Sequence, residues 1–81
     1  MKFYCLRRAR MAKTEVLERI LERKISDGQW INDREKGLAY LKSLRDEYQR
    51  GKPAEVILRS HPEISIRYRA DIKMHEVCVE A

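Results

Sequence analysis

Residues 64–74 alternate between apolar and polar side chains without a break, and this pattern restricts the fold more than any other feature of the sequence. The apolar set is Ile64, Ile66, Tyr68, Ala70, Ile72 and Met74, and the polar set is Ser65, Arg67, Arg69, Asp71 and Lys73. A period of two is typical of a strand with one buried face. Because a lone strand cannot satisfy its own backbone, it needs a partner. We expect that partner to be either residues 2–8 or the same strand of a second copy across a homodimer axis.

The middle of the chain has the periodicity of helices instead. Two apolar stripes recur at helical spacing, the first after Thr14 and the second after Asn32-x-x-Glu35, which is a capping-box sequence. These stripes are Val16, Leu17, Ile20, Leu21 and Ile25, then Leu38, Leu41, Leu44 and Tyr48. Pro53 suits the start of a short third helix, and Pro62 prevents its continuation.

These elements predict one small α+β domain that spans residues 1–81. It consists of an αα-hairpin, a short third helix and a C-terminal strand that can pair with an N-terminal strand. The alternative is an all-α fold with a helix-turn-helix-like C-terminal half, in which Ser65 caps a fourth helix. Both folds place Arg67, Arg69 and Lys73 where they can contact a ligand.

The positive charge is concentrated at the N-terminus. The first thirteen residues hold five cations and no acid, whereas residues 14–81 balance thirteen basic with thirteen acidic side chains, so this segment accounts for the whole net charge of +5. The five cations are Lys2, Arg7, Arg8, Arg10 and Lys13. We expect residues 1–13 to form a basic N-terminal arm or a short strand. A natural start at Met11 would remove four of these cations and leave the chain nearly neutral.

This charge distribution predicts a small basic regulatory protein that binds nucleic acid, with DNA favoured over RNA. An arginine cluster can lie along a phosphate backbone, where each neutralised phosphate releases counterions and makes binding salt-dependent. The residues expected to do so are Arg7, Arg8, Arg10 and Lys13. A two-stranded ribbon also fits the major groove, where arginine can bind guanine through two hydrogen bonds. The residues expected to orient the protein or contact bases are Arg67, Arg69 and Lys73.

The alternative function is that of a protein-interaction module or inhibitor, of the kind that mobile elements encode, which docks on a nucleic-acid-handling protein. Aromatic side chains and arginine dominate protein interfaces, so Trp30, Tyr40 and Tyr48 are its candidate anchors. Trp30 has a competing role in the core, because a domain this small needs its single tryptophan for packing. The two functions differ in how strongly salt weakens binding.

Catalytic motifs are absent from the sequence. It has no glycine-rich phosphate loop, no H-E-x-x-H and no G-x-S-x-G, so we expect neither an enzyme nor a cofactor. His75-x-x-Cys78 has the spacing of zinc ligands, but Cys5 and His61 are isolated and structural zinc sites use two close pairs. We therefore expect no metal, and we expect buried thiols rather than a Cys5–Cys78 disulfide.

The sequence also has no apolar stretch that approaches the ~20 residues needed to span a bilayer. Its first ten residues carry charges where a signal peptide is apolar. We expect no membrane partner and a cytoplasmic location.

Overall fold

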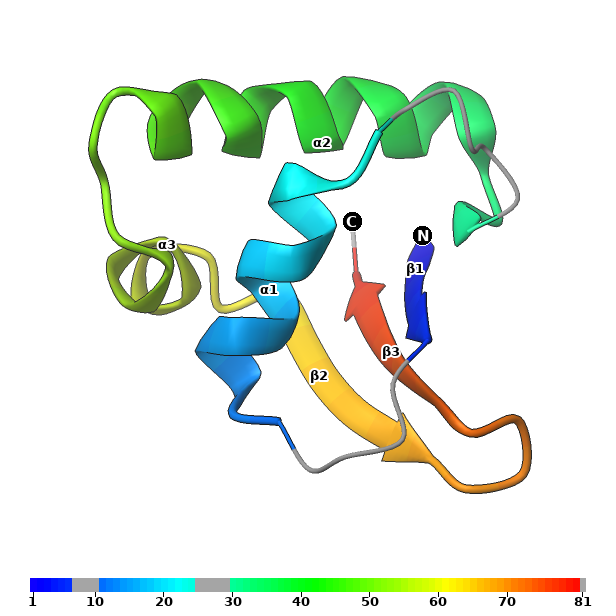
Figure 1. Ribbon diagram of the computed structural model, residues 1–81. Helices are drawn as coiled ribbons and strands as arrows, with labels where there is room; N and C mark the ends of the chain where they lie inside the picture. Colours follow the sequence, from blue (N-terminus) through cyan, green and yellow to red (C-terminus); the bar gives the residue numbers. More distant parts are fainter. Residues whose placement is uncertain (7–10, 25–29, 81) are drawn as a thin grey trace.

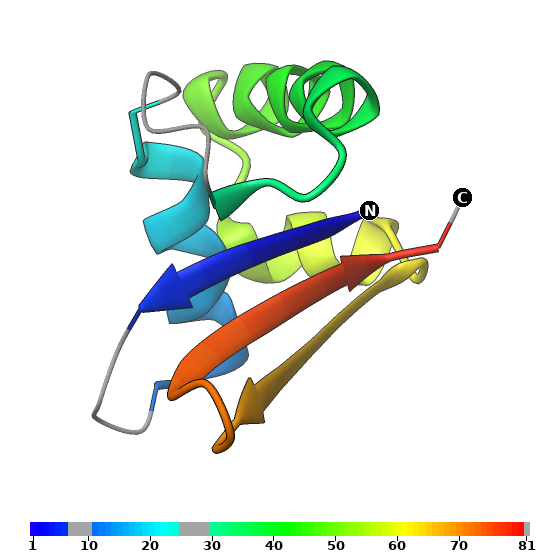
Figure 2. The same ribbon diagram turned by 90° about the vertical axis from the view of Figure 1, so that its right-hand side faces the viewer.

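The computed structural model describes residues 1–6, 11–24 and 30–80, and these residues form a small α+β domain (Figure 1). In chain order the elements are β1 (Lys2–Leu6), α1 (Lys13–Glu22), α2 (Arg34–Gln49), α3 (Ala54–Ser60), β2 (Ile64–Arg69) and β3 (Met74–Val79). The helices gather on one side of a three-stranded sheet, and no described helix covers the other side (Figure 2). The predicted α+β class is therefore confirmed.

The sheet has the order β1-β3-β2, with both neighbouring pairs antiparallel. The C-terminal strand pairs with the N-terminal strand, which is one of the two partners expected from the sequence. Phe3 and Ile66 both lie opposite Val77, from either side of it. Since 64–69 and 74–79 are strands, the all-α alternative with a helix-turn-helix-like half is wrong.

The single strand expected over 64–74 is instead the first half of a hairpin. β2 ends at Arg69, residues 70–73 form the turn, and β3 begins at Met74, directly opposite Arg69. Lys73 has a positive φ of 53° in this turn. The turn changes which positions face the helices, from even-numbered ones in β2 to odd-numbered ones in β3. Met74 therefore does not share a face with Ile64 and Ile66, although the alternation of residue types continues unbroken between them.

The core lies between the helices and one face of the sheet. The largest fully buried apolar side chains come from β1, β3 and the helices α1, α2 and α3: Phe3, Val16, Leu17, Ile20, Leu41, Ile57 and Val77. The apolar stripe predicted for α1 is buried at Val16, Leu17, Ile20 and Leu21. In Figure 1 α2 crosses the end of α1 instead of running back alongside it, so the two predicted helices meet over a short contact.

Residues 30–33 connect the start of α2 to the outer edge of β1 through backbone contacts. Ile31 forms a β-bridge with Phe3, and the backbone N–H of Lys2 donates to Asn32 Oδ1 at 2.8 Å. Asp33, one residue after the predicted cap, is the N-cap of α2 and accepts from the N–H of Lys36. α2 approaches so closely that a Cβ on Gly37 would lie 2.4 Å from Ile31 Cγ2. Only glycine fits at this position without displacing its neighbours.

The C-terminal end of α1 is capped by a side chain from α2. The guanidinium of Arg45 donates to the carbonyl of Leu21 at 2.7 Å, and it also contacts the carbonyls of Ile20 and Arg23. Burial lowers the pKa of Arg45. The carbonyl of Ile20 also accepts from the backbone N–H of Arg23 at 3.2 Å. Arg45 adds a donor for the last carbonyls of α1, so one arginine caps the end of α1 and joins it to α2.

The two ends of the described chain are hydrogen-bonded to each other. The amino group of Met1 donates to the carbonyl of Val79 at 3.0 Å, and the N–H of Val79 donates to the carbonyl of Met1 at 2.8 Å. Residues 2–6 are thus a strand, as one of the two predictions for 1–13 had it, and Lys13 begins α1. No helix in the described ranges is long and apolar enough to cross a membrane.

Candidate nucleic-acid interface on the open sheet face

The sheet side that faces away from the helices, here called the open face, carries most of the polar residues of the strands. Alternation puts Phe3, Val77 and Ile66 against the helices, so their neighbours along each strand point the other way. The open face consists of Lys2 and Tyr4 on β1, Met74, Glu76 and Cys78 on β3, and Ser65, Arg67 and Arg69 on β2. Tyr4, Glu76 and Arg67 form one row across the three strands.

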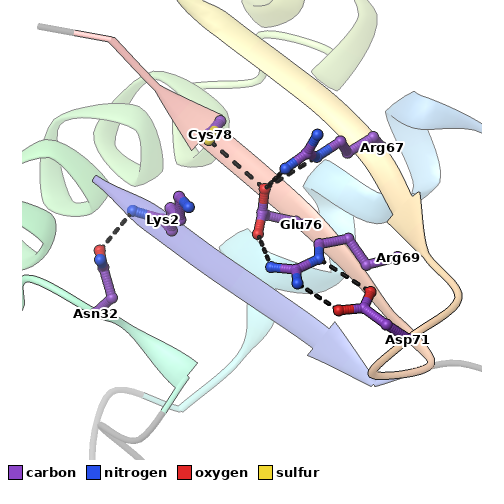
Figure 3. Close-up of polar contacts among 7 residues, drawn as sticks. All are labelled: Lys2, Asn32, Arg67, Arg69, Asp71, Glu76 and Cys78. Atoms are coloured by element: carbon purple, nitrogen blue, oxygen red, sulfur yellow. Dashed lines mark hydrogen bonds and ion pairs between the residues drawn. The ribbon is translucent and has the colours of Figure 1, made fainter.

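A fully buried carboxylate lies at the centre of this face. Glu76 has 0% of its surface exposed, and two arginines from β2 cover it (Figure 3). Arg67 donates from Nε to Glu76 Oε1 at 3.1 Å, and its Nη2 forms an ion pair with the same oxygen at 3.1 Å. Arg69 donates from Nη1 to Glu76 Oε2 at 3.0 Å, and the thiol of Cys78 lies 3.7 Å from Oε1.

These contacts keep Glu76 ionised. Burial by itself raises the pKa of Glu76, but the hydrogen bonds from Arg69 and Arg67, together with the positive charges of Lys2 and Arg67, lower it below its usual value. A charged acceptor makes both hydrogen bonds stronger than neutral ones. Glu76 therefore fixes the positions of two arginines that would otherwise be mobile on the surface.

Arg69 is the more tightly held of the two arginines. Besides its bond to Glu76, it donates from Nε to Asp71 Oδ1 at 3.1 Å and from Nη2 to the other oxygen of Asp71. The hydrogen bonds that Arg69 donates to Asp71 and then to Glu76 raise the pKa of Arg69. All three of its nitrogens thus bind carboxylates. Arg67 is less confined, because its side chain remains 67% exposed.

The open face adjoins the basic N-terminal segment. Leu6, the last residue of β1, pairs with Met74, and Met74 also lies opposite Arg69. The chain therefore leaves the sheet at the end where Arg69 is found. The candidate phosphate-binding residues Arg7, Arg8 and Arg10 follow directly in sequence but lie outside the described residues.

The remaining cations predicted for binding lie off this face. Lys13 is exposed at the start of α1, and Lys73 is exposed in the turn between β2 and β3. The prediction that Lys73 shares one strand face with Arg67 and Arg69 is wrong, because β2 ends before it.

The three aromatic residues proposed as interface anchors do not form one exposed cluster. Trp30 is only 3% exposed and packs against Phe3, with Arg23 lying 5.0 Å from its ring centroid. The hydroxyls of Tyr40 and Tyr48 donate to carboxylates of other elements. Tyr40 donates to Glu63 at 2.7 Å and Tyr48 donates to Glu22 at 3.0 Å.

A second polar cluster joins the ends of α2 and α3 to the start of β2. His61 lies between two carboxylates, with Nε2 2.9 Å from Glu47 and Nδ1 3.1 Å from Glu63. Lys52 donates to Glu47 at 2.7 Å. The pKa of Glu47 is lowered, first by the Lys52 hydrogen bond and then by His61, and the pKa of Glu63 is lowered, first by the Tyr40 hydroxyl. Since His61 directly follows α3, its contacts with Glu47 and Glu63 attach the end of α3 to α2 and to the start of β2.

The two cysteines lie on opposite sides of the sheet. Cys5 is buried on the helix side of the sheet, opposite His75, whereas Cys78 belongs to the open face. Since they point to opposite sides, they cannot form a disulfide within one molecule. Among residues 1–6, 11–24 and 30–80, no group of three or more histidine, cysteine or acidic side chains has a geometry that could hold a metal ion.

Tyr4 and Glu76 belong to the same row as Arg67 but are not among the site residues predicted from the sequence. A signal for Glu76 was present: it is an acidic residue within the apolar run of residues 74–79. Folding residues 64–79 into a hairpin places it opposite Arg67, which explains why a carboxylate is tolerated there. Comparison with protein-family models, curated proteins and solved structures finds no match, so the geometry of the face carries the functional argument.

Proposed function

We propose that this protein is a small nucleic-acid-binding regulator, which contacts its ligand with the open face and with the basic residues that follow β1. The observation that supports this best is the arrangement of the open face. It presents arginines held over a buried carboxylate, no described helix covers it, and the chain leaves it directly into Arg7, Arg8 and Arg10.

The local charge favours an anionic ligand. On the open face and in the turn between β2 and β3, two acids, Glu76 and Asp71, are opposed by four cations, which leaves a net charge of +2. The cations are Lys2, Arg67, Arg69 and Lys73. The adjoining Arg7, Arg8 and Arg10 add three more positive charges with no acid among them. Phosphates that approach this end of the sheet therefore meet a local excess of positive charge, whereas the chain beyond residue 13 is neutral as a whole.

The experiment is fluorescence anisotropy with labelled DNA and RNA at several salt concentrations. The first variant replaces Arg7, Arg8 and Arg10 by glutamine. A matched control removes three exposed cations from the helical layer, Arg34, Lys42 and Arg59. We expect the first variant to weaken binding and to reduce the dependence of log K on log salt by about 2–3 if each arginine binds one phosphate. Equal losses in both variants, or no binding at low salt, would contradict the proposal.

A protein-interaction module is the second candidate, and one observation favours it. Tyr68 and Ile72, at the end of the β2–β3 hairpin, are 46% and 38% exposed. Large exposed apolar side chains next to charged ones are typical of protein contact sites. For this function the candidate anchors are the hairpin residues Tyr68 and Ile72, in place of Trp30, Tyr40 and Tyr48. Binding of a protein from cell extract that survives high salt and is lost in Tyr68→Ser would support it.

Either function is compatible with a homodimer, but a dimer formed by pairing β2 with the β2 strand of a second copy is disfavoured. Antiparallel pairing of β2 with a second copy, centred on Arg67, would place two arginines directly opposite each other. Like charges at such positions destabilise a sheet. Sedimentation equilibrium tests whether another surface supports a dimer.

A further inference from the structure

We propose that the open face binds single-stranded nucleic acid, with unpaired bases stacked on the Tyr4 ring and on the guanidinium plane of Arg67. This inference rests on the proposed function and narrows its ligand. It differs from the expectation drawn from the sequence, in which a two-stranded ribbon enters the major groove of duplex DNA.

The arginines of the face are poorly suited to bind base edges. Binding guanine in a duplex requires two donors of one arginine to be directed at the base. Arg69 instead uses its three nitrogens on Glu76 and Asp71, and Arg67 uses Nε and Nη2 on Glu76. A base could compete for these donors only by breaking ion pairs to a carboxylate that would then be left buried without partners.

The same ion pair makes Arg67 suitable for stacking. The N–H donors of a guanidinium lie in its plane, so hydrogen bonds to Glu76 occupy the edge of the group and leave its flat face available. The side chain of Arg67 is 67% exposed, which gives a ligand access to it. Proteins that recognise single strands stack unpaired bases on aromatic rings and on arginine planes held in this way.

Tyr4, which is partly buried, supplies an aromatic ring as the second stacking group in the same row. It lies directly opposite Glu76 on β1, while Arg67 lies opposite Glu76 on β2. With strands spaced at ~4.8 Å, the backbones of Tyr4 and Arg67 are about 10 Å apart on the same face. Lys2 lies two residues from Tyr4 on the same face, where its ammonium group can bind a phosphate next to a base stacked on Tyr4.

Glu76 acts in this arrangement as a positioning residue. It does not contact the ligand itself, because it is fully buried beneath the arginines. Its replacement by glutamine keeps the size of the side chain but removes the charge that fixes Arg67. We expect Glu76→Gln to weaken binding to single strands while leaving the salt dependence nearly unchanged, since the phosphate contacts remain.

The test compares a 12-nucleotide single-stranded DNA, the RNA of the same sequence, and the corresponding DNA duplex, at one low and one moderate salt concentration. We expect both single strands to bind more tightly than the duplex. Tyr4→Leu should weaken single-strand binding about 5- to 150-fold, which corresponds to ~1–3 kcal/mol for one stacked base. Tyr4→Phe keeps the ring and should recover most of that loss, whereas Tyr48→Leu, on α2, serves as the matched control on the helical side.

Arg67→Lys is the variant that separates stacking from charge. Lysine keeps the positive charge but has no plane, so a role in stacking predicts a loss on single strands and little change on the duplex. This substitution is at an exposed side chain, and it therefore tests the inference even if Tyr4→Leu fails to fold. Circular dichroism of each variant identifies such a failure.

The outcomes are distinguishable. Tighter binding of the duplex, or full affinity of both Tyr4→Leu and Arg67→Lys for single strands, would overturn the inference and leave the proposed function in place. Binding of none of the three ligands at low salt would overturn both.

Discussion

Gly37 allows a direct test of how α2 is seated on the sheet. A helix-interior glycine is normally unfavourable, so replacing it by alanine should stabilise an exposed helix by about 1 kcal/mol. In this structure the added Cβ would lie 2.4 Å from Ile31 Cγ2 and 3.4 Å from a ring carbon of Phe3. Ile31 cannot easily move away, because it is branched at Cβ and its backbone bridges to Phe3.

The two effects have opposite signs, and the steric one should dominate. Overpacking a core costs about 1–3 kcal/mol, and the shortness of this contact places Gly37→Ala near the upper end. After the gain in helix propensity, we expect a net loss of about 1–2 kcal/mol in the free energy of unfolding. For a domain of this size that lowers Tm by about 4–16 °C.

Thermal and urea unfolding followed by circular dichroism measure this change. Ala39→Gly, at an exposed position of the same helix, gives the size of the propensity effect alone. If Gly37→Ala raised Tm by about as much as Ala39→Gly lowers it, α2 would not lie as close to Ile31 as described. The explanation for the glycine would then be refuted.

Three further predictions follow from contacts described above. Arg45→Lys should lower the free energy of unfolding by about 1–2 kcal/mol, because lysine cannot donate to several carbonyls at the end of α1 at once. Urea unfolding measures this loss, and equal stability of the two proteins would show that the cap is unimportant. Stability should be constant from about pH 4.5 to neutral pH and fall at lower pH, because carboxyls whose pKa is lowered in the folded state must take up protons. Glu76→Gln should reduce the slope of Tm against pH in the acid range. A chain that starts at Met11 should fail to fold, since it lacks a strand and the fully buried Phe3, and a cooperative thermal transition in it would contradict this.

The last of these predictions changes how the N-terminal charge can be tested. Removing residues 1–10 would take away four of the five N-terminal cations, and it could be used to ask whether a basic arm binds nucleic acid. Since residues 2–6 form an edge of the sheet, that deletion would destroy the fold as well as the charge. Substitution of Arg7, Arg8 and Arg10 removes only the charge, so it is the sounder experiment.

A helix or strand could be predicted from the sequence where a single periodic pattern of apolar residues covered that one element. The stripe from Val16 to Leu21 identified α1, and the alternation after Ile64 identified β2, because each reports which side of a single element is buried. The pairing of the N-terminal and C-terminal strands was also within reach, since a strand needs a partner. What could not be predicted was the turn at residues 70–73. Apolar and polar residues keep alternating through it, so the change of buried side leaves no trace in the pattern.

That undetected turn also concealed the candidate site. Until β3 is folded back on β2, Arg67 has no acidic neighbour and Glu76 has no reason to be buried. The arginines were therefore expected to be free donors, and their confinement by Glu76 and Asp71 depends on tertiary contacts. The stacking role proposed for Tyr4 could not be predicted either, because Tyr4 lies beside Glu76 and Arg67 only when β1 has joined the sheet.

The position of β3 between its two neighbours has a consequence for folding and for ligand binding together. β2 and β3 are joined by a short turn and can pair early, but β1 must close a loop in which the bonded residues Met1 and Val79 are 78 positions apart. Loops of that length form slowly, so β1 is expected to dock late and to fray first. A ligand held by Tyr4 and Arg67 would contact both outer strands across β3. Binding would then stabilise the sheet with β1 docked relative to the form in which β1 is frayed. The free energy of unfolding would therefore be highest when the ligand is bound.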